Sequence, residues 1–236
     1  MKPLVFVVSD SRGRNFPNFE REVRQRQYET CYIVRPGAKI EDLEAETLDR
    51  IGRVDSNRLI VVKIAAGINN FTNKSKNKYH EYEITVKNIP APTVFWKLTH
   101  FKLEIKKLHQ KSIVTYCTIP PAYLVHTQRH AIERKKLLHP SYSEKQLSEQ
   151  TDFLVQSIVQ INQAINESNT LMQLNIIPKT VSLHNECLKT KPNGKLNRLV
   201  SRLTDGIHGT ERTQRTWFRK IHEAVNKEIN LYTGNH

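Results

Sequence analysis

Residues 4–13 read LVFVVSDSRG. The first five are apolar and mostly β-branched, and a short continuous run of this kind is typical of a strand buried in a parallel sheet. The polar Ser-Asp-Ser-Arg-Gly that follows indicates that the chain leaves the sheet in a loop. We therefore predict a buried first strand that delivers Asp10 and Ser11 to the edge of a sheet.

Extended and helical patterns alternate along the rest of the chain. Further strands are expected at 31–34, 59–66, 112–118 and 180–183, and helices at 17–27, 40–51, 93–109, 147–167 and 210–231. This alternation predicts one α/β domain over residues 1–236, with three α/β/α layers around a mostly parallel, five-stranded, flavodoxin-like sheet. An extra strand or hairpin is expected within 79–87, an irregular or partly helical excursion at 122–146, and a loop over much of 188–200.

The charge balance favours an anionic partner. The 236 residues include 37 Lys and Arg against 23 Asp and Glu, a formal net charge of +14. Such an excess suggests nucleic acid, an anionic membrane surface or a phosphorylated small molecule as partner or substrate. The alternative is a surface charge that serves only solubility.

The cysteines and histidines give no metal or disulfide pattern. Cys31, Cys117 and Cys187 are widely spaced and form no CxxC pair, so we expect buried free thiols in a reducing compartment. The histidines lack ligand spacing, and we expect neither a metal nor another cofactor. No apolar run has the length of a signal-peptide core or a membrane span, so we expect a soluble, intracellular protein, cytoplasmic or nuclear.

Ligands of such sheets bind beyond the carboxyl ends of the strands, where Ser11 is expected. A serine hydroxyl becomes a good nucleophile when a base takes its proton. His208 is the best candidate for that base, because Asp205 lies three residues before it and can orient its imidazole. Both precede the last predicted helix, at a loop-to-helix junction.

Acyl transfer also needs hydrogen-bond donors for the oxyanion. The Ser11 N–H, the Gly37 N–H and the Asn69 side-chain amide are available at predicted strand ends. Each residue has a plainer interpretation. Ser11 and Asp205 could be helix caps, His208 a first-turn residue without a catalytic task, and Asn69 and Gly37 turn residues.

Taken together, these segments resemble the SGNH (GDSL-type) hydrolase superfamily. Its four signatures are matched in order by Asp10-Ser11, Gly37, residues 67–70 (GINN) and residues 205–208 (DGIH), across nearly the whole chain. Ser9 and Asn70 stand where the family usually has Gly and Asp. The resemblance implies a serine esterase with Ser11 as nucleophile, His208 as base, Asp205 as orienting carboxylate, and Gly37 and Asn69 in the oxyanion hole.

Basic residues near these segments support a second hypothesis. The candidates for anion binding are Arg12, Arg14, Arg198, Arg202 and Arg212. They favour a module of the same fold that binds RNA or DNA through its basic surface, either without catalysis or beside it. The first hypothesis takes a small-molecule, lipid or sugar ester as substrate, and the sequence leaves the acyl group, the alcohol and the oligomeric state open.

Overall fold

A parallel sheet forms the centre of the computed structural model, which describes residues 1–22, 27–172 and 180–234. Its strands are β1 (Leu4–Ser9), β2 (Glu29–Val34), β3 (Ile60–Ala65) and β6 (Ser112–Tyr116), in the order β2-β1-β3-β6. All three pairings are parallel, and β1 is central, with Phe6 opposite Cys31 on one side and Val62 on the other. The expected α/β class is confirmed.

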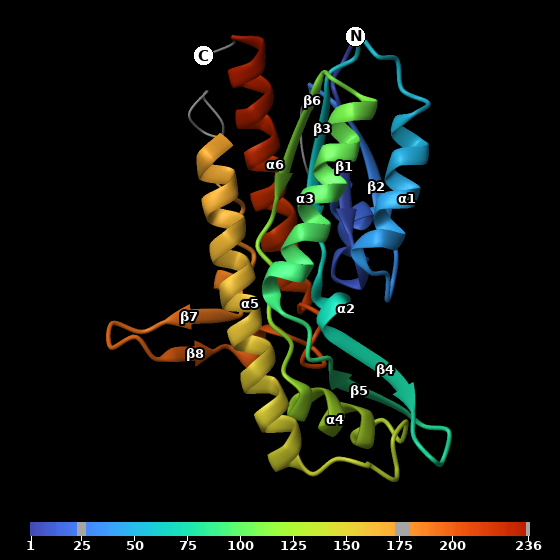
Figure 1. Ribbon diagram of the computed structural model, residues 1–236, viewed down its shortest axis with the longest axis vertical. Helices are drawn as coiled ribbons and strands as arrows, with labels where there is room; N and C mark the ends of the chain where they lie inside the picture. The colour runs from blue at the N-terminus through green and yellow to red at the C-terminus, as the bar shows by residue number, and fades with distance from the viewer. Residues whose placement is uncertain (23–26, 173–179, 235–236) are drawn as a thin grey trace.

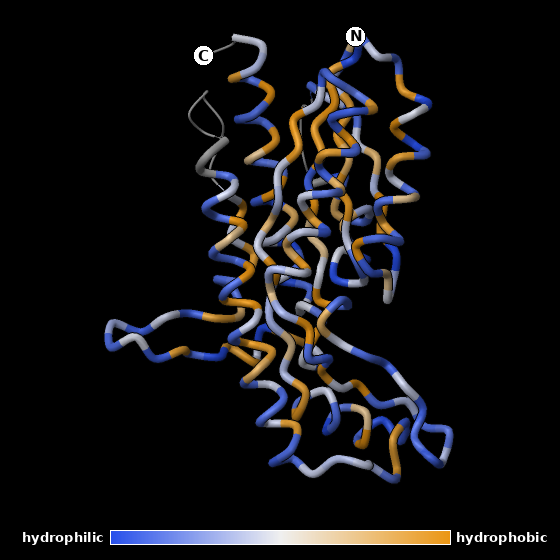
Figure 2. Tube along the Cα trace, in the orientation of Figure 1, coloured by the Kyte–Doolittle hydropathy of each residue, from blue (hydrophilic) through white to orange (hydrophobic). Residues whose placement is uncertain are grey.

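Helices cover both faces of this sheet. The helices α1 (Ile40–Ile51), α3 (Ala91–Leu108) and α5 (Glu144–Met172) share one core with Phe6 and Val8 of β1. Val5 and Val7, which alternate with them along β1, face a second core on the other side of the sheet, and α6 (Glu211–Thr233) completes this core. Figure 1 shows α3 in front of the sheet with α1 and α5 on either side, and Figure 2 shows apolar residues concentrated between these layers. The three-layer architecture therefore follows from the alternation of side chains along β1.

The prediction of a fifth strand at 180–183 is wrong, because the central sheet has four strands. Val181 forms one isolated parallel bridge with Cys117, and the pairing stops there. The reason is Thr118, whose hydroxyl accepts the N–H groups of Leu183 at 2.8 Å and His184 at 3.2 Å. A side chain thus takes the place of the backbone acceptors that a continued strand would use.

His184 lies against the same hydroxyl, with Nδ1 2.8 Å from Thr118 Oγ1. Burial, followed by the positive charge of Lys220, lowers the pKa of His184 from 6.5 to about 4. Between these values the unfolded chain binds the proton and the folded chain does not, so the free energy of unfolding falls as the pH falls through that window. We expect wild type to lose more stability than His184→Gln between about pH 7 and about pH 4.5 in urea unfolding. Equal losses of stability in the wild type and in His184→Gln would contradict the attribution of this pH dependence to His184.

The remaining elements gather at the carboxyl ends of the strands. The expected hairpin is present as β4 (Thr72–Lys76) paired antiparallel with β5 (Tyr82–Val86), preceded by α2 (Ile68–Phe71). The excursion at 122–146 contains α4 (Leu124–Glu133). In Figure 1 the strands of the central sheet run downward, and this hairpin and α4 lie below them.

Two further segments differ from expectation. Residues 188–200, expected as a loop, form a hairpin of β7 (Leu188–Thr190) and β8 (Leu196–Arg198). The expected helix at 17–27 is a 3-10 helix over Phe16–Glu22, and the rest of that expectation falls largely outside the described residues. Across the described ranges, no helix has the length and apolarity needed to cross a membrane.

Candidate active site

The turn after β1 positions Ser11. Asp10 caps a short 3-10 helix over Ser11–Gly13, and its Oδ1 accepts the Arg12 N–H at 3.0 Å. Gly13 packs so tightly against β1 that an added Cβ would lie 2.7 Å from the Cβ of Ser9. The chain therefore turns sharply away from the sheet at Asp10, and Ser11 faces the space beyond the strand ends.

A second turn positions Asp205 and His208. Asp205 Oδ1 accepts the N–H groups of Ile207 at 3.1 Å and His208 at 2.8 Å. Gly206 has a φ of +80°, and a Cβ there would lie 2.5 Å from the carbonyl oxygen of Tyr123. A residue with a side chain could not take this place without moving the backbone, so the glycine is required for the turn.

The two turns meet in one chain of hydrogen bonds. Asp205 Oδ2 lies 2.7 Å from His208 Nδ1, and His208 Nε2 lies 2.9 Å from Ser11 Oγ. The serine and the histidine are 197 positions apart in the sequence. The fold therefore brings together the three side chains that sequence analysis singled out, in the order carboxylate, imidazole, hydroxyl.

Asp205 is held as a carboxylate. Burial acts to raise its pKa, but the hydrogen bonds from the His208 side chain and from the N–H groups of His208 and Ile207 outweigh it. The net pKa of Asp205 lies well below its ordinary value. An ionised Asp205 accepts a hydrogen bond from the Nδ1–H group of His208, which leaves Nε2 with a lone pair facing Ser11.

Ser11 and His208 open into a pocket of about 540 Å³ that Gly37 and Asn69 also line. The Asn69 Nδ2 group donates a hydrogen bond of 2.9 Å to the carbonyl oxygen of Ala38. Because an amide NH2 has two hydrogens, the second can serve a ligand in the pocket. Both residues predicted as oxyanion donors therefore share a cavity with the serine.

Asn70, the last residue of the GINN segment, ties two elements together. Its Oδ1 accepts the Ile40 N–H at 3.1 Å, and its Nδ2 donates to Glu41 Oε2 at 2.9 Å. The buried side chain thus fixes the start of α1 against α2. The neighbouring Asn69 lines the pocket together with Gly37.

The five arginines predicted to bind anions do not form one surface. Arg12 is 3% exposed and donates to the Pro120 carbonyl oxygen at 2.6 Å, so its prediction as a surface anion contact is wrong. Arg14 lines the pocket of Ser11. Arg198 pairs with Asp152, Arg202 is half-buried, and Arg212 lines a separate hollow on α6.

Sequence analysis missed other residues that line the pocket. Lys39, Lys74 and Lys87 contribute to its wall together with Thr72 and Asn73. Four of these five lie on β4 or directly after β5. An alternating pattern signals such a hairpin, but nothing local to it indicates that it folds over the end of the sheet.

Comparison with known proteins identifies the fold. No protein-family model matches the sequence, and no curated protein matches it. A member of the lipolytic protein G-D-S-L family from Veillonella parvula matches with a TM-score of 0.59 and 10% identity, over 95% of this chain and 98% of that one. A serine-to-alanine variant of an acetyl esterase, solved with acetate ion, matches with a TM-score of 0.55 and 11% identity, over 96% and 98%. A carbohydrate esterase family 3 structure from Talaromyces cellulolyticus matches with a TM-score of 0.54 and 12% identity, over 96% and 98%. The chain therefore has the SGNH hydrolase fold along nearly its whole length.

Proposed function

We propose that this chain is a serine esterase in which Ser11 is the nucleophile, His208 the general base and Asp205 the residue that orients His208. The observation that carries the proposal is the hydrogen-bond chain from Asp205 through His208 to Ser11 Oγ, at the wall of an open pocket. A hydroxyl, an imidazole and a carboxylate in this order are the components of acyl transfer through a covalent intermediate.

The proposed reaction has two halves. As Ser11 Oγ attacks the ester carbonyl carbon, His208 Nε2 takes the hydroxyl proton, and Asp205 stabilises the imidazolium. The tetrahedral intermediate then collapses, the acyl–oxygen bond breaks, and His208 returns the proton to the departing alcohol. Water then attacks the acyl carbon and gives a proton to His208. His208 passes that proton to Ser11 Oγ as the bond between the acyl group and Ser11 breaks, and the acyl group leaves as a carboxylic acid.

In this mechanism the N–H groups of Ser11 and Gly37 and the amide of Asn69 stabilise the negative charge on the carbonyl oxygen. We expect Asn69→Ala to lower kcat roughly 10²- to 10³-fold, as loss of one oxyanion donor does elsewhere, with a smaller change in KM. Steady-state hydrolysis of p-nitrophenyl acetate measures both constants. Asn57→Ala, at an exposed position, is the control, and a change below about threefold in Asn69→Ala would exclude Asn69 from this role.

The structural neighbours include a lipolytic protein, an acetyl esterase and a carbohydrate esterase. They support carboxylic esters as the substrate class proposed here. The alternative from sequence analysis, a nucleic-acid-binding module without catalysis, gives no reason for Ser11, His208 and Asp205 to align. We therefore favour the enzyme.

Turnover of p-nitrophenyl acetate by wild type and Ser11→Ala tests the proposal. We expect hydrolysis by the wild type and its loss in the variant, with circular dichroism showing that the variant is folded. Persistent hydrolysis in folded Ser11→Ala would overturn the assignment of the nucleophile.

A further inference from the structure

The pocket of Ser11 carries charge of one sign. Among the described residues that line it, Arg14, Lys39, Lys74 and Lys87 are basic, and no aspartate or glutamate is present. The serine esterase mechanism proposed above uses none of these four cations. An uncharged ester would gain nothing specific from them.

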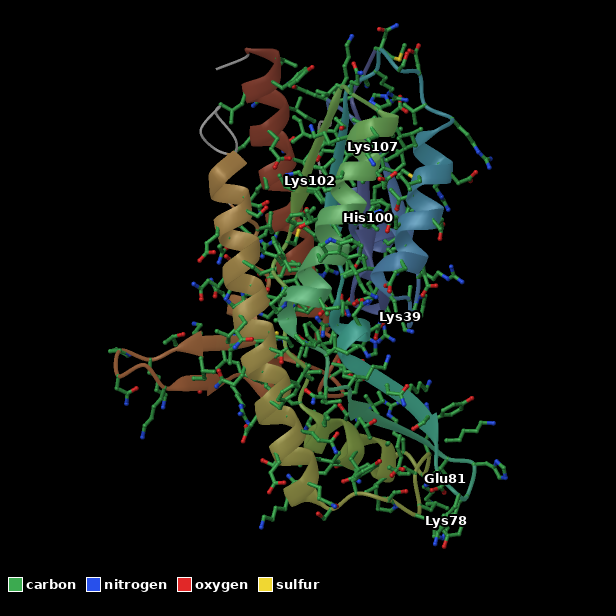
Figure 3. The ribbon with its side chains drawn as sticks, in the orientation of Figure 1. Lys39, Lys78, Glu81, His100, Lys102 and Lys107 are labelled. Atoms are coloured by element: carbon green, nitrogen blue, oxygen red, sulfur yellow. The ribbon has the colours of Figure 1, made fainter. Side chains whose placement is uncertain are left out.

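The cations come from separate elements that the fold brings together. Arg14 follows the turn of Ser11, and Lys39 directly precedes α1. Lys74 lies on β4, and Lys87 follows β5, where its N–H donates to the Phe71 carbonyl oxygen at 2.8 Å. Figure 3 shows Lys39 at the lower end of α1, close to the start of β4. A cluster built from distant segments is a property of the tertiary structure and not of one basic run.

Lys39 and Lys87 line the same pocket, where their positive charges oppose each other. Burial, and after it the positive charge of Lys39, lowers the pKa of Lys87, while Glu41 acts in the opposite direction. Glu41 itself is occupied, since one oxygen pairs with Lys97 and the other accepts the Asn70 amide at 2.9 Å. Within the described part of the chain, neither Lys39 nor Lys87 forms an ion pair with a carboxylate.

Two cations outside the pocket, one after α1 and one on α3, each pair with a carboxylate. Arg53, just beyond the end of α1, lies 2.8 Å from Asp49, and Lys107 on α3 lies 2.6 Å from Glu104. The high net charge of the chain therefore does not by itself explain the charge of the pocket. Unpaired cations around a cavity repel one another, and a bound anion relieves this repulsion.

We infer that the substrate is a carboxylic ester that also carries an anionic group, a carboxylate or a phosphate, which Lys39 and Lys87 bind while Ser11 attacks the ester carbonyl. This inference rests on the proposed esterase activity. Water adds across the ester: the acyl–oxygen bond breaks, the alcohol oxygen gains a proton, the acyl group leaves as a carboxylic acid, and the anionic group is unchanged.

A matched pair of esters tests the inference. The probe is p-nitrophenyl hydrogen glutarate, which carries a carboxylate, and its methyl ester is the uncharged counterpart. We expect kcat/KM for the wild type to be about tenfold higher with the anionic ester. The ratio of kcat/KM for the anionic ester to kcat/KM for the uncharged ester should fall towards one in Lys39→Gln/Lys87→Gln. It should fall in the same way in the wild type when salt rises from about 50 mM to about 500 mM.

The control variant removes the same charge elsewhere. Lys78, at the tip of the β4–β5 hairpin, and Lys107, on α3, lie away from Lys39 in Figure 3. We expect Lys78→Gln/Lys107→Gln to keep the wild-type ratio, which separates a local site from the overall field. An equal loss of the ratio in both double variants would overturn the assignment of Lys39 and Lys87.

The outcomes separate this inference from the proposed function. Hydrolysis of both esters with equal kcat/KM in the wild type would overturn the anionic substrate and leave the esterase intact. Hydrolysis of neither ester by the folded wild type would overturn both. A second arm presents an acyl glycerol phosphate either free in solution or in vesicles. Faster hydrolysis in solution would identify a soluble source of the phosphate, and faster hydrolysis in vesicles would identify a lipid source.

Discussion

Replacing either Ser11 or His208 by alanine is expected to lower kcat for p-nitrophenyl acetate by roughly 10⁵-fold or more, and replacing both is expected to cost no more than either change alone. The two side chains act as one unit, because Oγ is a weak nucleophile until Nε2, 2.9 Å away, takes its proton. Once one of them is absent, the other has no remaining part in the attack.

Steady-state rates of wild type, both single variants and the double variant give this comparison. Ser56→Ala, at an exposed position, should keep the wild-type rate and controls for the substitution itself. A double variant slower than either single variant by a further large factor would mean that Ser11 and His208 act independently. That result would contradict the hydrogen-bonded pair as the source of reactivity.

The second large effect that we expect is a loss of stability, caused by breaking an ion pair buried between β3 and α6. Lys63 on β3 and Glu228 on α6 form an ion pair in which each side chain is 1% exposed. Thr115 completes the cluster, accepting a hydrogen bond from Lys63 Nζ at 2.7 Å and donating one to Glu228 Oε1 at 3.3 Å. The paired charges are balanced, but either one alone would be buried without compensation.

We therefore expect Glu228→Ala to lower the free energy of unfolding by about 3–5 kcal/mol, because it leaves the Lys63 ammonium unpaired in the core. The double variant Lys63→Met/Glu228→Leu should recover most of this loss, since it removes both charges and keeps the volume. Urea unfolding measures both, with Glu223→Ala, at an exposed position of the same helix, as control. A loss below about 1 kcal/mol in Glu228→Ala would contradict this account.

The sequence predicts the parts of this fold that depend on local pattern. The apolar run that begins at Leu4 predicts β1, and the spacing of Ile40, Leu43 and Ile51 predicts α1. The position of Ser11 after β1, and the three-residue spacing of Asp205 and His208, were enough to predict which side chains meet.

The differences arise where tertiary contacts override local pattern. The fifth strand is limited to a single bridge because Thr118 occupies the N–H groups that would extend it. Arg12 reads as a surface charge, yet its guanidinium is buried against Pro120. Lys74 and Lys87 line the pocket only because the β4–β5 hairpin folds over the end of the sheet. The periodicity of the sequence predicts a hairpin, but it does not predict where that hairpin packs.

The central claim is an activated serine at position 11, and labelling with a fluorophosphonate tests it most directly. Such a probe reacts with a serine whose proton is taken by a neighbouring base, and mass spectrometry of the digested protein locates the adduct. The account predicts one adduct on the peptide that contains Ser11 in the wild type, and none in folded Ser11→Ala. An adduct on another residue, or no adduct in folded wild type, would contradict it.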